Sequence, residues 1–307
     1  CMLIWRSFTH WIGGMGVLVF ILCLLPLTGG YHMNLMKAES PGPSVSKLVP
    51  KVQSTAKILY TIYIILTIVE IIFLLIGKMP LFDTLCLSFG TAGTGGFGVK
   101  NDSIASYSTY NQVVITVFMI LFGINFNAYY LLLTKKVMQA AKNEEVRYYL
   151  GIIGLAIVAI AINTREMFTS FGSAFQQAAF QVGSIITTTG YATTDFNVWP
   201  VFSKTILVIL MFVGACAGST GGGIKVSRLL ILCKSARKEL QLYLHPNAVK
   251  KIKMDDKAIP HEVVRATNMF LFVYIMIFVI SLLIISLDNL DMVSNFTAIA
   301  ATLNNIG

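Results

Sequence analysis

Three short segments rich in glycine and in hydroxyl or amide side chains recur along the chain, each directly after a short apolar segment. They read GTAGTGGFGVKND, ITTTGYATTDF and TLNNIG, and begin at Gly90, Ile186 and Thr302. Carbonyl and hydroxyl oxygens can replace the water around a cation, and glycine permits the backbone angles that a carbonyl-lined strand needs. One such cluster is more typical of a surface turn, but three at equivalent positions favour a cation pathway.

A fourth glycine-rich segment, MFVGACAGSTGGGIKVSRLL (Met211–Leu230), raises a second chemistry. A phosphate-binding loop needs its lysine directly after the last glycine, whereas here Ile224 stands in that place, before Lys225, and no strand precedes the segment. Glycine lets membrane helices pack closely, but the four glycines within Gly218–Gly223 disfavour a continuous helix. We therefore predict one apolar helix, Val201–Cys233, broken by a loop inside the membrane.

Composition indicates the elements that must position these segments. The chain has 307 residues, of which 56% are hydrophobic and 12% charged, against about 25% charged residues in soluble domains. This favours an all-α integral membrane protein and disfavours a nucleic-acid partner, in spite of the net charge of +9. Segments long enough to cross a bilayer are Trp11–Leu27, Ile58–Gly77, Gln112–Leu133, Tyr149–Phe168, Val201–Cys233 and Thr267–Leu287. Shorter segments, predicted as half-helices that enter the membrane and return, are Pro80–Thr91, Phe171–Thr187 and Asp291–Thr302. Cysteines predicted as small buried hydrophobes are Cys1, Cys23, Cys86, Cys216 and Cys233.

Basic residues gather in three loops, Tyr31–Lys57, Thr134–Arg147 and Lys225–Arg265. The last of these holds ten Lys or Arg and four Asp or Glu residues. Because basic loops stay on the cytoplasmic side, we expect all three loops there and the three glycine-rich clusters on the outer side.

An internal repeat organises the chain as spanning helix, half-helix, glycine-rich cluster, spanning helix and basic loop. We predict the second half of repeat 1 with its loop at 1–57, repeat 2 at 58–147, repeat 3 with the broken helix at 148–265, and the first part of repeat 4 at 266–307. Gly95 and Gly190, taken as equivalent, lie 95 residues apart, which places the cluster of repeat 1 before Cys1, so we expect the native protein to be longer. The fold class is thus four pseudo-symmetric repeats around one axis, as in K⁺ channels. An alternating-access transporter for an organic solute uses inverted repeats and is the weaker hypothesis, as is a purely structural protein.

Five stretches carry a resemblance to a known family: WRSFTHWIGGMGVLVF, GTGGFGVKNDSI, TTTGYATTDFNVWP, GACAGSTGGGIKVSRLL and TLNNIG. Over its whole length the chain resembles the TrkH-type membrane subunit of the Trk/Ktr/HKT superfamily of bacterial potassium uptake systems. CAGSTGGGIK and NNIG favour the Trk branch, and a Ktr-like Na⁺/K⁺ translocating subunit is the alternative.

The resemblance implies potassium uptake across the bacterial cytoplasmic (inner) membrane, without enzymatic chemistry. It implies K⁺ as the only ligand and no organic cofactor, a homodimer in contact with membrane lipid, and a cytoplasmic nucleotide-binding regulatory subunit that is TrkA-like. Coupling to H⁺ or Na⁺ as a symporter, and K⁺/Na⁺ selectivity, stay open. The positions implied as the selectivity filter are Gly93, Thr94, Gly95, Thr188, Thr189, Gly190, Asn304, Asn305, Ile306 and Gly307. The positions implied as a gate loop that blocks the pore are Gly214, Cys216, Gly218, Ser219, Thr220, Gly221, Gly222, Gly223 and Lys225.

Two charged residues have more than one interpretation. Glu70 lies in the middle of a predicted span, where an ionisable side chain is costly and marks a functional site by default; a structural role and a proton-coupling role are both open. Lys225 is expected to hold the loop closed by pairing with a carboxylate, to repel cations, or simply to reach the cytoplasmic interface.

Some polar residues near the predicted helices are expected to organise packing. Asn125 and Asn127 are interpreted as hydrogen-bonding partners between helices, with pore lining as the alternative. Arg6 and His10 are expected to line the pore or pack near it, and Trp199–Pro200 to begin the broken helix at the membrane interface. Hydroxyl groups predicted as further cation ligands are those of Thr94, Thr188 and Thr189.

Overall fold

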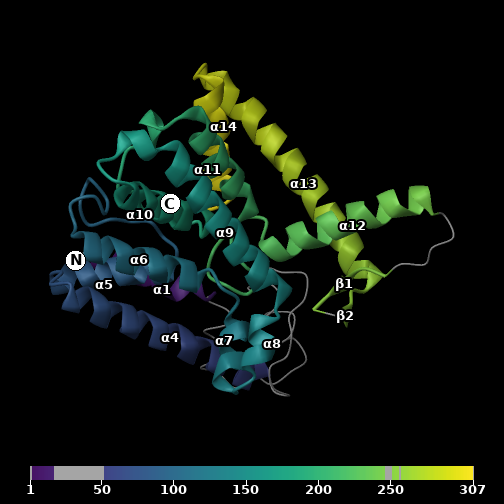
Figure 1. The fold of residues 1–307 in the computed structure, drawn as a ribbon, viewed down its shortest axis with the longest axis horizontal. Coiled ribbons are helices and arrows are strands. Elements are labelled where there is room, and N and C mark those ends of the chain that lie inside the picture. The colour runs from purple at the N-terminus through teal and green to yellow at the C-terminus, as the bar shows by residue number, and fades with distance from the viewer. Residues whose placement is uncertain (1, 17–51, 246–250, 256, 307) are drawn as a thin grey trace.

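The structure, a computed structural model, describes residues 2–16, 52–245, 251–255 and 257–306. This part of the chain is built of helices joined by turns, with one short antiparallel hairpin (Figure 1). The helices are α1 (Met2–Gly14), α4 (Val52–Ile76), α5 (Leu81–Ala92), α6 (Thr109–Phe122), α7 (Phe126–Leu133), α8 (Val137–Ala141), α9 (Glu144–Asn163), α10 (Phe171–Ile186), α11 (Val201–Val213), α12 (Val226–Leu244), α13 (His261–Ile285) and α14 (Met292–Leu303). Single 3-10 turns lie at Arg165–Met167, Phe196–Val198 and Ser286–Asp288, and the hairpin strands are β1 (Lys253–Met254) and β2 (Lys257–Ala258).

Three described helices are long and apolar enough to cross a membrane: Ala56–Ile76 within α4, Glu144–Asn163, and His261–Asp288. The predicted span Gln112–Leu133 is wrong as a single helix, because α6 and α7 meet at a bend of 91°. Gly123 ends α6, and the Asn125 side chain accepts a hydrogen bond from the first turn of α7, so the apolar run contains a helix end and a new N-cap.

Other predicted boundaries shift at polar helix ends. The span expected to begin at Trp11 instead belongs to a helix that ends at Gly14, and Gly16 has a φ of +85°; residues 17–27 of that prediction lie outside the described residues. Helix α9 begins five residues before Tyr149 and α13 begins six residues before Thr267. Their polar first turns are helical although they lack the apolar pattern on which the predictions depend.

The three short helices occur where they were predicted. Helices α5, α10 and α14 correspond to Pro80–Thr91, Phe171–Thr187 and Asp291–Thr302. Two of them begin with a side-chain cap, in which Ser170 and Asp291 accept hydrogen bonds from Ser173 N and Ser294 N. Each half-helix packs against at least two other helices: α5 contacts α1, α4 and α6, α10 contacts α6, α9 and α11, and α14 contacts α11 and α13.

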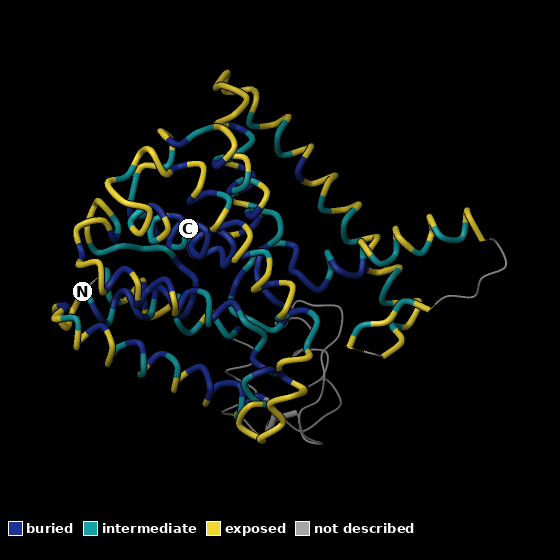
Figure 2. The backbone as a smooth tube through the Cα atoms, in the orientation of Figure 1, coloured by how far each residue is buried: buried dark blue, intermediate teal, exposed yellow. Residues whose placement is uncertain are grey.

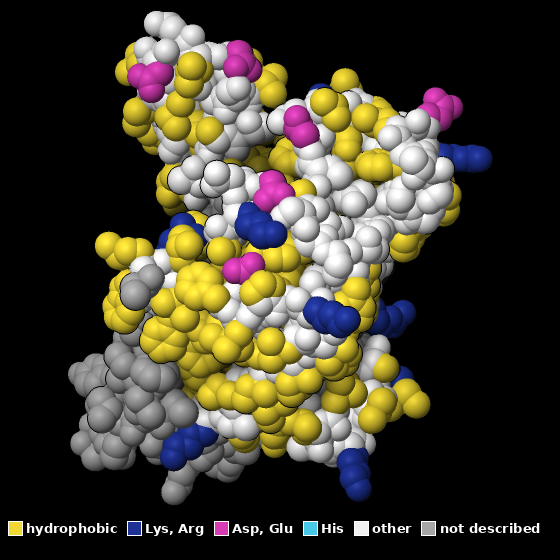
Figure 3. Space-filling view, turned by 90° about the vertical axis from the view of Figure 1, so that its left-hand side faces the viewer, with side chains coloured by type: hydrophobic (Ala, Val, Ile, Leu, Met, Phe, Trp, Pro, Cys, Tyr) yellow, Lys and Arg dark blue, Asp and Glu magenta, His cyan; other side chains and the backbone are white. Residues whose placement is uncertain are grey.

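Apolar side chains both fill the centre and cover the outside. One buried cluster joins α4, α5 and α6, and a second joins α9, α10 and α11. Helix α13 buries little of its surface (Figure 2), and it exposes large side chains such as Phe272, Ile280 and Leu283. On the face in Figure 3, hydrophobic side chains lie between an upper part that carries Asp and Glu with some Lys and Arg, and a lower part that carries Lys and Arg. Such surfaces are those of a membrane protein.

The predicted break in Val201–Cys233 is confirmed and is wider than Gly218–Gly223. Helix α11 ends at Val213 and α12 begins at Val226. We call the segment between them, Gly214–Lys225, the Gly-rich loop. Pro200 directly precedes α11, as predicted, but the neighbouring Trp199 is buried, with its ring 6.5 Å from that of Phe168.

Candidate functional site

The three half-helices end in turns with the same backbone conformation. In each turn, three successive N–H groups donate to carbonyl oxygens four, three and five residues earlier, and the middle residue of the three has a positive φ. These middle residues are Thr94, Thr188 and Asn305, with φ of 55°, 60° and 57°. Positive φ is uncommon outside glycine and costs roughly 1 to 3 kcal/mol. The same pattern also ends α4 at Lys78 and α7 at Lys135, so it is a common way to end a helix. What the three turns share beyond it is their place directly after a half-helix.

This hydrogen-bond pattern corrects the register of the repeat. It makes Gly95 equivalent to Thr189 and Ile306, so the residue equivalent to Gly190 is Gly96, 94 residues earlier. Gly96 and Gly190 both have positive φ, of 66° and 87°. A Cβ atom on Gly96 would lie 2.0 Å from Thr189 O, so the first two turns touch through their backbones.

The corrected register adds two residues to the predicted positions, Gly96 and Thr187. Sequence reasoning missed them because it aligned glycines with glycines. Alignment of the half-helix ends would have found them, since α5, α10 and α14 end at Ala92, Ile186 and Leu303, two residues before the positive φ. Gly307 lies outside the described residues.

The threonine hydroxyls predicted as cation ligands are engaged in hydrogen bonds. The Oγ1 atoms of Thr94 and Thr188 donate to Gly93 O and Thr187 O, both at 2.7 Å. Thr189 Oγ1 lies 2.8 Å from Thr187 Oγ1. In this arrangement the hydroxyl protons help to fix the turns.

The Gly-rich loop contacts all three turns. Thr94 Oγ1 lies 3.2 Å from Thr220 O, and Gly222 N donates to Thr188 Oγ1 at 2.5 Å. The third turn is reached at Gly222, where an added Cβ would lie 2.3 Å from Asn304 O. The loop therefore packs directly against the three turns, and Gly222 permits this close approach.

The first half of the Gly-rich loop rests on the bend between α6 and α7. Cys216 N donates to Gly123 O at 3.0 Å, and Phe126 N donates to Gly218 O at 3.0 Å. Irregular backbone at membrane depth must satisfy its polar groups inside the protein. The two interrupted helices meet this requirement by bonding to each other, which is why α6 and α7 do not continue as one span.

Lys225 lies inside the protein. It is 2% exposed, has a φ of +81°, and donates through Nζ to Gly221 O. The hypothesis that it reaches the membrane interface is wrong. No carboxylate of the described residues lies within ion-pair distance of its ammonium group, so Lys225 holds the Gly-rich loop through a carbonyl oxygen.

A cavity of about 360 Å³ opens beside the first turn. Its lining residues are Thr9, His10, Gly13, Gly14, Gly93, Thr94, Thr220 and Asn305. The His10 ring packs edge-on against Phe97 with centroids 5.3 Å apart, and Arg6 donates to Gly98 O at 3.3 Å. The prediction that Arg6 and His10 pack near the pathway agrees with this placement, because both contact the chain after the first turn.

Glu70 does not line this cavity. Its side chain is fully buried, and neither carboxyl oxygen has a hydrogen-bond partner among the described residues.

Of the described cysteines, Cys86 and Cys216 are buried as predicted, whereas Cys233 on α12 is exposed and contradicts the prediction.

Glu145 is a site residue that sequence reasoning missed. Its position falls within the predicted basic loop Thr134–Arg147, yet it is 4% exposed. Its Oε1 accepts from Ala217 N at 2.6 Å and from Ser227 N at 3.2 Å, and its Oε2 accepts from Asn125 Nδ2 at 3.2 Å. The last contact confirms Asn125 as a hydrogen-bonding partner between helices.

Known proteins are similar to this chain in both sequence and fold. The family model described as cation transport protein, TrkH, matches residues 1–307. The curated "Trk system potassium uptake protein TrkH" of Vibrio parahaemolyticus is 38% identical over 313 residues, and that of Salmonella typhimurium is 35% identical over 310 residues. Each match covers 99% of this chain and 64% of the relative.

A solved structure gives the same result. The crystal structure of the potassium transporter TrkH from Vibrio parahaemolyticus aligns with a TM-score of 0.85 at 34% sequence identity, over 100% of this chain and 64% of that chain. The chain thus spans about 64% of the length of these relatives.

Proposed function

Because this chain belongs to the TrkH family of cation transport proteins, we propose that it forms the ion pathway of a membrane protein for potassium uptake. The observation that carries the proposal is the convergence of three identical turns on one Gly-rich loop. Similarity to proteins named for potassium uptake supports the choice of ion. Transport of a cargo ion needs no catalytic residues and no organic cofactor, and K⁺ is the only ligand that the proposal requires.

The turns act as a selectivity filter in this proposal. Each lies at the C-terminal end of a half-helix, where the helix dipole places partial negative charge and favours a cation. Carbonyl oxygens of successive turns, rather than the engaged threonine hydroxyls, replace the hydration shell of the ion. The residues of the three described turns, with the corrected register, are Gly93, Thr94, Gly95, Gly96, Thr187, Thr188, Thr189, Gly190, Asn304, Asn305 and Ile306.

The Gly-rich loop acts as the gate. It lies within hydrogen-bonding distance of the turns and blocks one end of the pathway. Since the basic loops belong on the cytoplasmic side of the bacterial inner membrane, K⁺ enters from the outer side. It first passes the turns and then reaches the Gly-rich loop on their cytoplasmic side. Helix α12 continues from the loop toward the hairpin, so a cytoplasmic partner that moves α12 would move the gate.

Partners are proposed on the family resemblance. The whole protein is expected to form a homodimer in membrane lipid and to bind a TrkA-like cytoplasmic subunit, whose nucleotide-dependent movement would act on α12. The four domain ranges stay predictions, and the ion coupling and the role of Glu70 stay open between the alternatives given above. Either a structural or a proton-coupling role suits a carboxyl group buried without a partner.

The test is potassium-dependent growth and rubidium tracer uptake in a bacterium without its own potassium uptake, supplied with the full-length protein. We expect growth rescue, and loss or altered selectivity of uptake with Gly190→Val, because Gly190 has a φ of +87°. The matched control is Gly151→Val, since nothing lies within 4 Å of a Cβ at Gly151. Absence of rescue and of tracer uptake would refute the proposed function, and normal uptake with Gly190→Val would remove the filter assignment.

A further inference from the structure

One carboxylate joins the two ends of the Gly-rich loop. Ala217 lies near the start of the loop and Ser227 just after its end, ten residues apart in the chain. Both donate their backbone N–H groups to the same oxygen, Glu145 Oε1. Backbone bonds from Ile224 N to Phe212 O and from Val226 N to Ala215 O bring the two arms together at the same level. We call this narrow part of the loop its neck.

Hydrogen bonds to a buried charged group are stronger than hydrogen bonds between neutral groups. Bonds of this kind are shorter and about twice as strong as neutral ones, and a buried carboxylate without partners is costly. Glu145 meets this condition with three donors, two peptide N–H groups and the Asn125 side-chain amide. Release of the neck would leave the carboxylate with only one of these donors, so the closed neck is the arrangement that satisfies Glu145.

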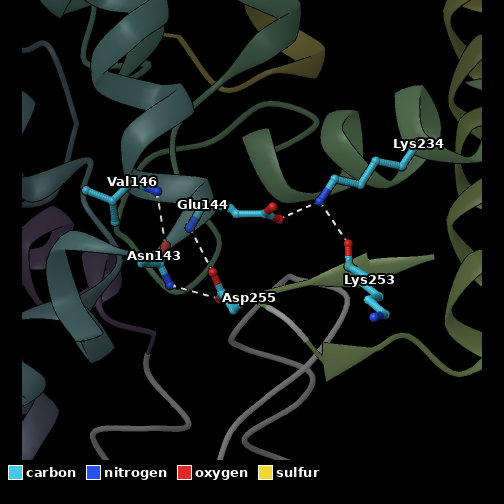
Figure 4. Close-up of polar contacts among 6 residues, drawn as sticks. All are labelled: Asn143, Glu144, Val146, Lys234, Lys253 and Asp255. Atoms are coloured by element: carbon cyan, nitrogen blue, oxygen red, sulfur yellow. Dashed lines mark hydrogen bonds and ion pairs between the residues drawn. The ribbon is translucent and has the colours of Figure 1, made fainter. Parts of the chain in front are cut away.

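A structural role as the cap of α9 does not explain Glu145. The cap of this helix is Asn143, whose Oδ1 accepts from Val146 N at 3.0 Å. Asp255 on the hairpin accepts from Glu144 N at 2.8 Å and from Asn143 Nδ2 at 3.2 Å (Figure 4). The N-terminus of α9 therefore already has two capping groups.

The same contacts fix the position of Glu145. Lys234 of α12 forms an ion pair with Glu144, and its ammonium group also donates to Lys253 O of the hairpin at 2.8 Å (Figure 4). Glu144, which the hairpin and α12 hold, is the residue directly before Glu145. The first turn of α9 thus connects the hairpin to the neck of the loop.

A cavity of about 430 Å³ reaches the neck from the basic end of the molecule. Its lining includes Asn125, Glu145, Ala217 and Ser227, together with Asp255 and Lys257 at the hairpin. Water and small reagents in this cavity can therefore reach the neck, which makes the state of the neck measurable.

We propose that Glu145 is a positioning residue that clamps the neck of the Gly-rich loop and so keeps Thr220–Gly222 against the turns. The consequence for transport rests on the proposed function of this loop as the gate. Whether Glu145 holds the neck closed can be tested without measuring ion flux.

The probe is Cys216, which is buried in the neck beside Ala217 and has no disulfide partner among the described residues. In the full-length protein with every other cysteine replaced by alanine, we expect Glu145→Ala to raise the rate of Cys216 modification by a water-soluble maleimide at least about tenfold. This factor corresponds to the loss of one charge-assisted hydrogen bond. Glu166→Ala, an exposed acid at the other end of α9, is the matched control and should leave the rate unchanged.

Glu145→Gln serves if the alanine variant does not fold. Its neutral amide oxygen can accept from both peptide N–H groups, but bonds to a neutral acceptor are about half as strong as bonds to a carboxylate. We therefore expect a smaller increase in modification, about twofold to tenfold, in a protein that elutes normally on size exclusion. An unchanged rate in a folded Glu145→Ala or Glu145→Gln protein would overturn the clamp. Rubidium flux is measured on the same samples: faster modification with higher flux supports the clamp and the gate, while faster modification with unchanged flux keeps the clamp and removes the gate function of the loop.

Discussion

Substitution of alanine for Gly222 tests the contact between the Gly-rich loop and the turns. The new Cβ would lie 2.3 Å from Asn304 O and 3.0 Å from Thr188 Oγ1. An ordinary C···O contact is about 3.3 Å, so the loop or the turn must move by about 1 Å. The turn is fixed, because Asn304 N donates to Ala300 O of α14 at 3.2 Å. We therefore expect the loop to move away from the turns.

The magnitude follows from the bonds that this movement breaks. The bond from Gly222 N to Thr188 Oγ1 is lost first, and the contact of Thr220 O with Thr94 Oγ1 weakens with it. At about 0.5 to 1.5 kcal/mol for each bond, the closed loop loses about 1 to 3 kcal/mol. The ratio of open to closed loops then rises about 5-fold to 150-fold. Gly222 has no positive φ, so backbone strain does not add to the effect.

The assay is rubidium tracer flux into vesicles that contain the full-length protein without added partner subunit. We expect basal flux to rise with Gly222→Ala and to stay unchanged with Gly151→Ala, where nothing lies within 4 Å of the new Cβ. Unchanged or lower flux in a folded Gly222→Ala protein would refute the reasoning that contact at this glycine holds the pathway closed.

Three further predictions use the same flux assay. Deletion of Gly218–Gly223 should leave the turns intact and raise basal flux, and unchanged flux would contradict a gate in this loop. Thr188→Val removes the acceptor of Gly222 N and should raise basal flux by about twofold to tenfold, whereas Thr188→Ser keeps it and should stay near wild type; equal fluxes for the two would show that this hydrogen bond is not used. For Glu70→Gln we expect a free energy of unfolding within about 1 kcal/mol of wild type, because neither carboxyl oxygen has a hydrogen-bond partner among the described residues. If the flux of this variant depends on pH as in wild type, Glu70 has a structural role. If the pH dependence is lost, Glu70 takes part in proton coupling.

The sequence predicted the parts of the fold that depend on local pattern. The half-helices α5, α10 and α14 were recognisable because a short apolar segment ends in a glycine-rich or polar cluster. The break after α11 was recognisable because many glycines are costly in a helix. The bend between α6 and α7 was not, since it depends on the Gly-rich loop, which bonds to Gly123 and Phe126 from far along the chain.

Two errors at the site have the same kind of cause. The register of the first turn depends on backbone hydrogen bonds, which sequence spacing does not show, so Gly95 was aligned with Gly190 in place of Gly96. Glu145 is one of two adjacent acids in a charged loop, and nothing in the pattern distinguishes it from the neighbouring Glu144. Only the fold turns Glu145 inward to Ala217 and Ser227 and leaves Glu144 to pair with Lys234.

The central claim is that the three turns hold the transported cation. The most direct measurement is anomalous diffraction from crystals of the full-length protein grown in rubidium. We predict anomalous peaks among the carbonyl oxygens of the turns at Thr94, Thr188 and Asn305, on the side away from Gly222. Crystals with ordered turns and no peak there, at rubidium concentrations that support flux, would contradict the claim.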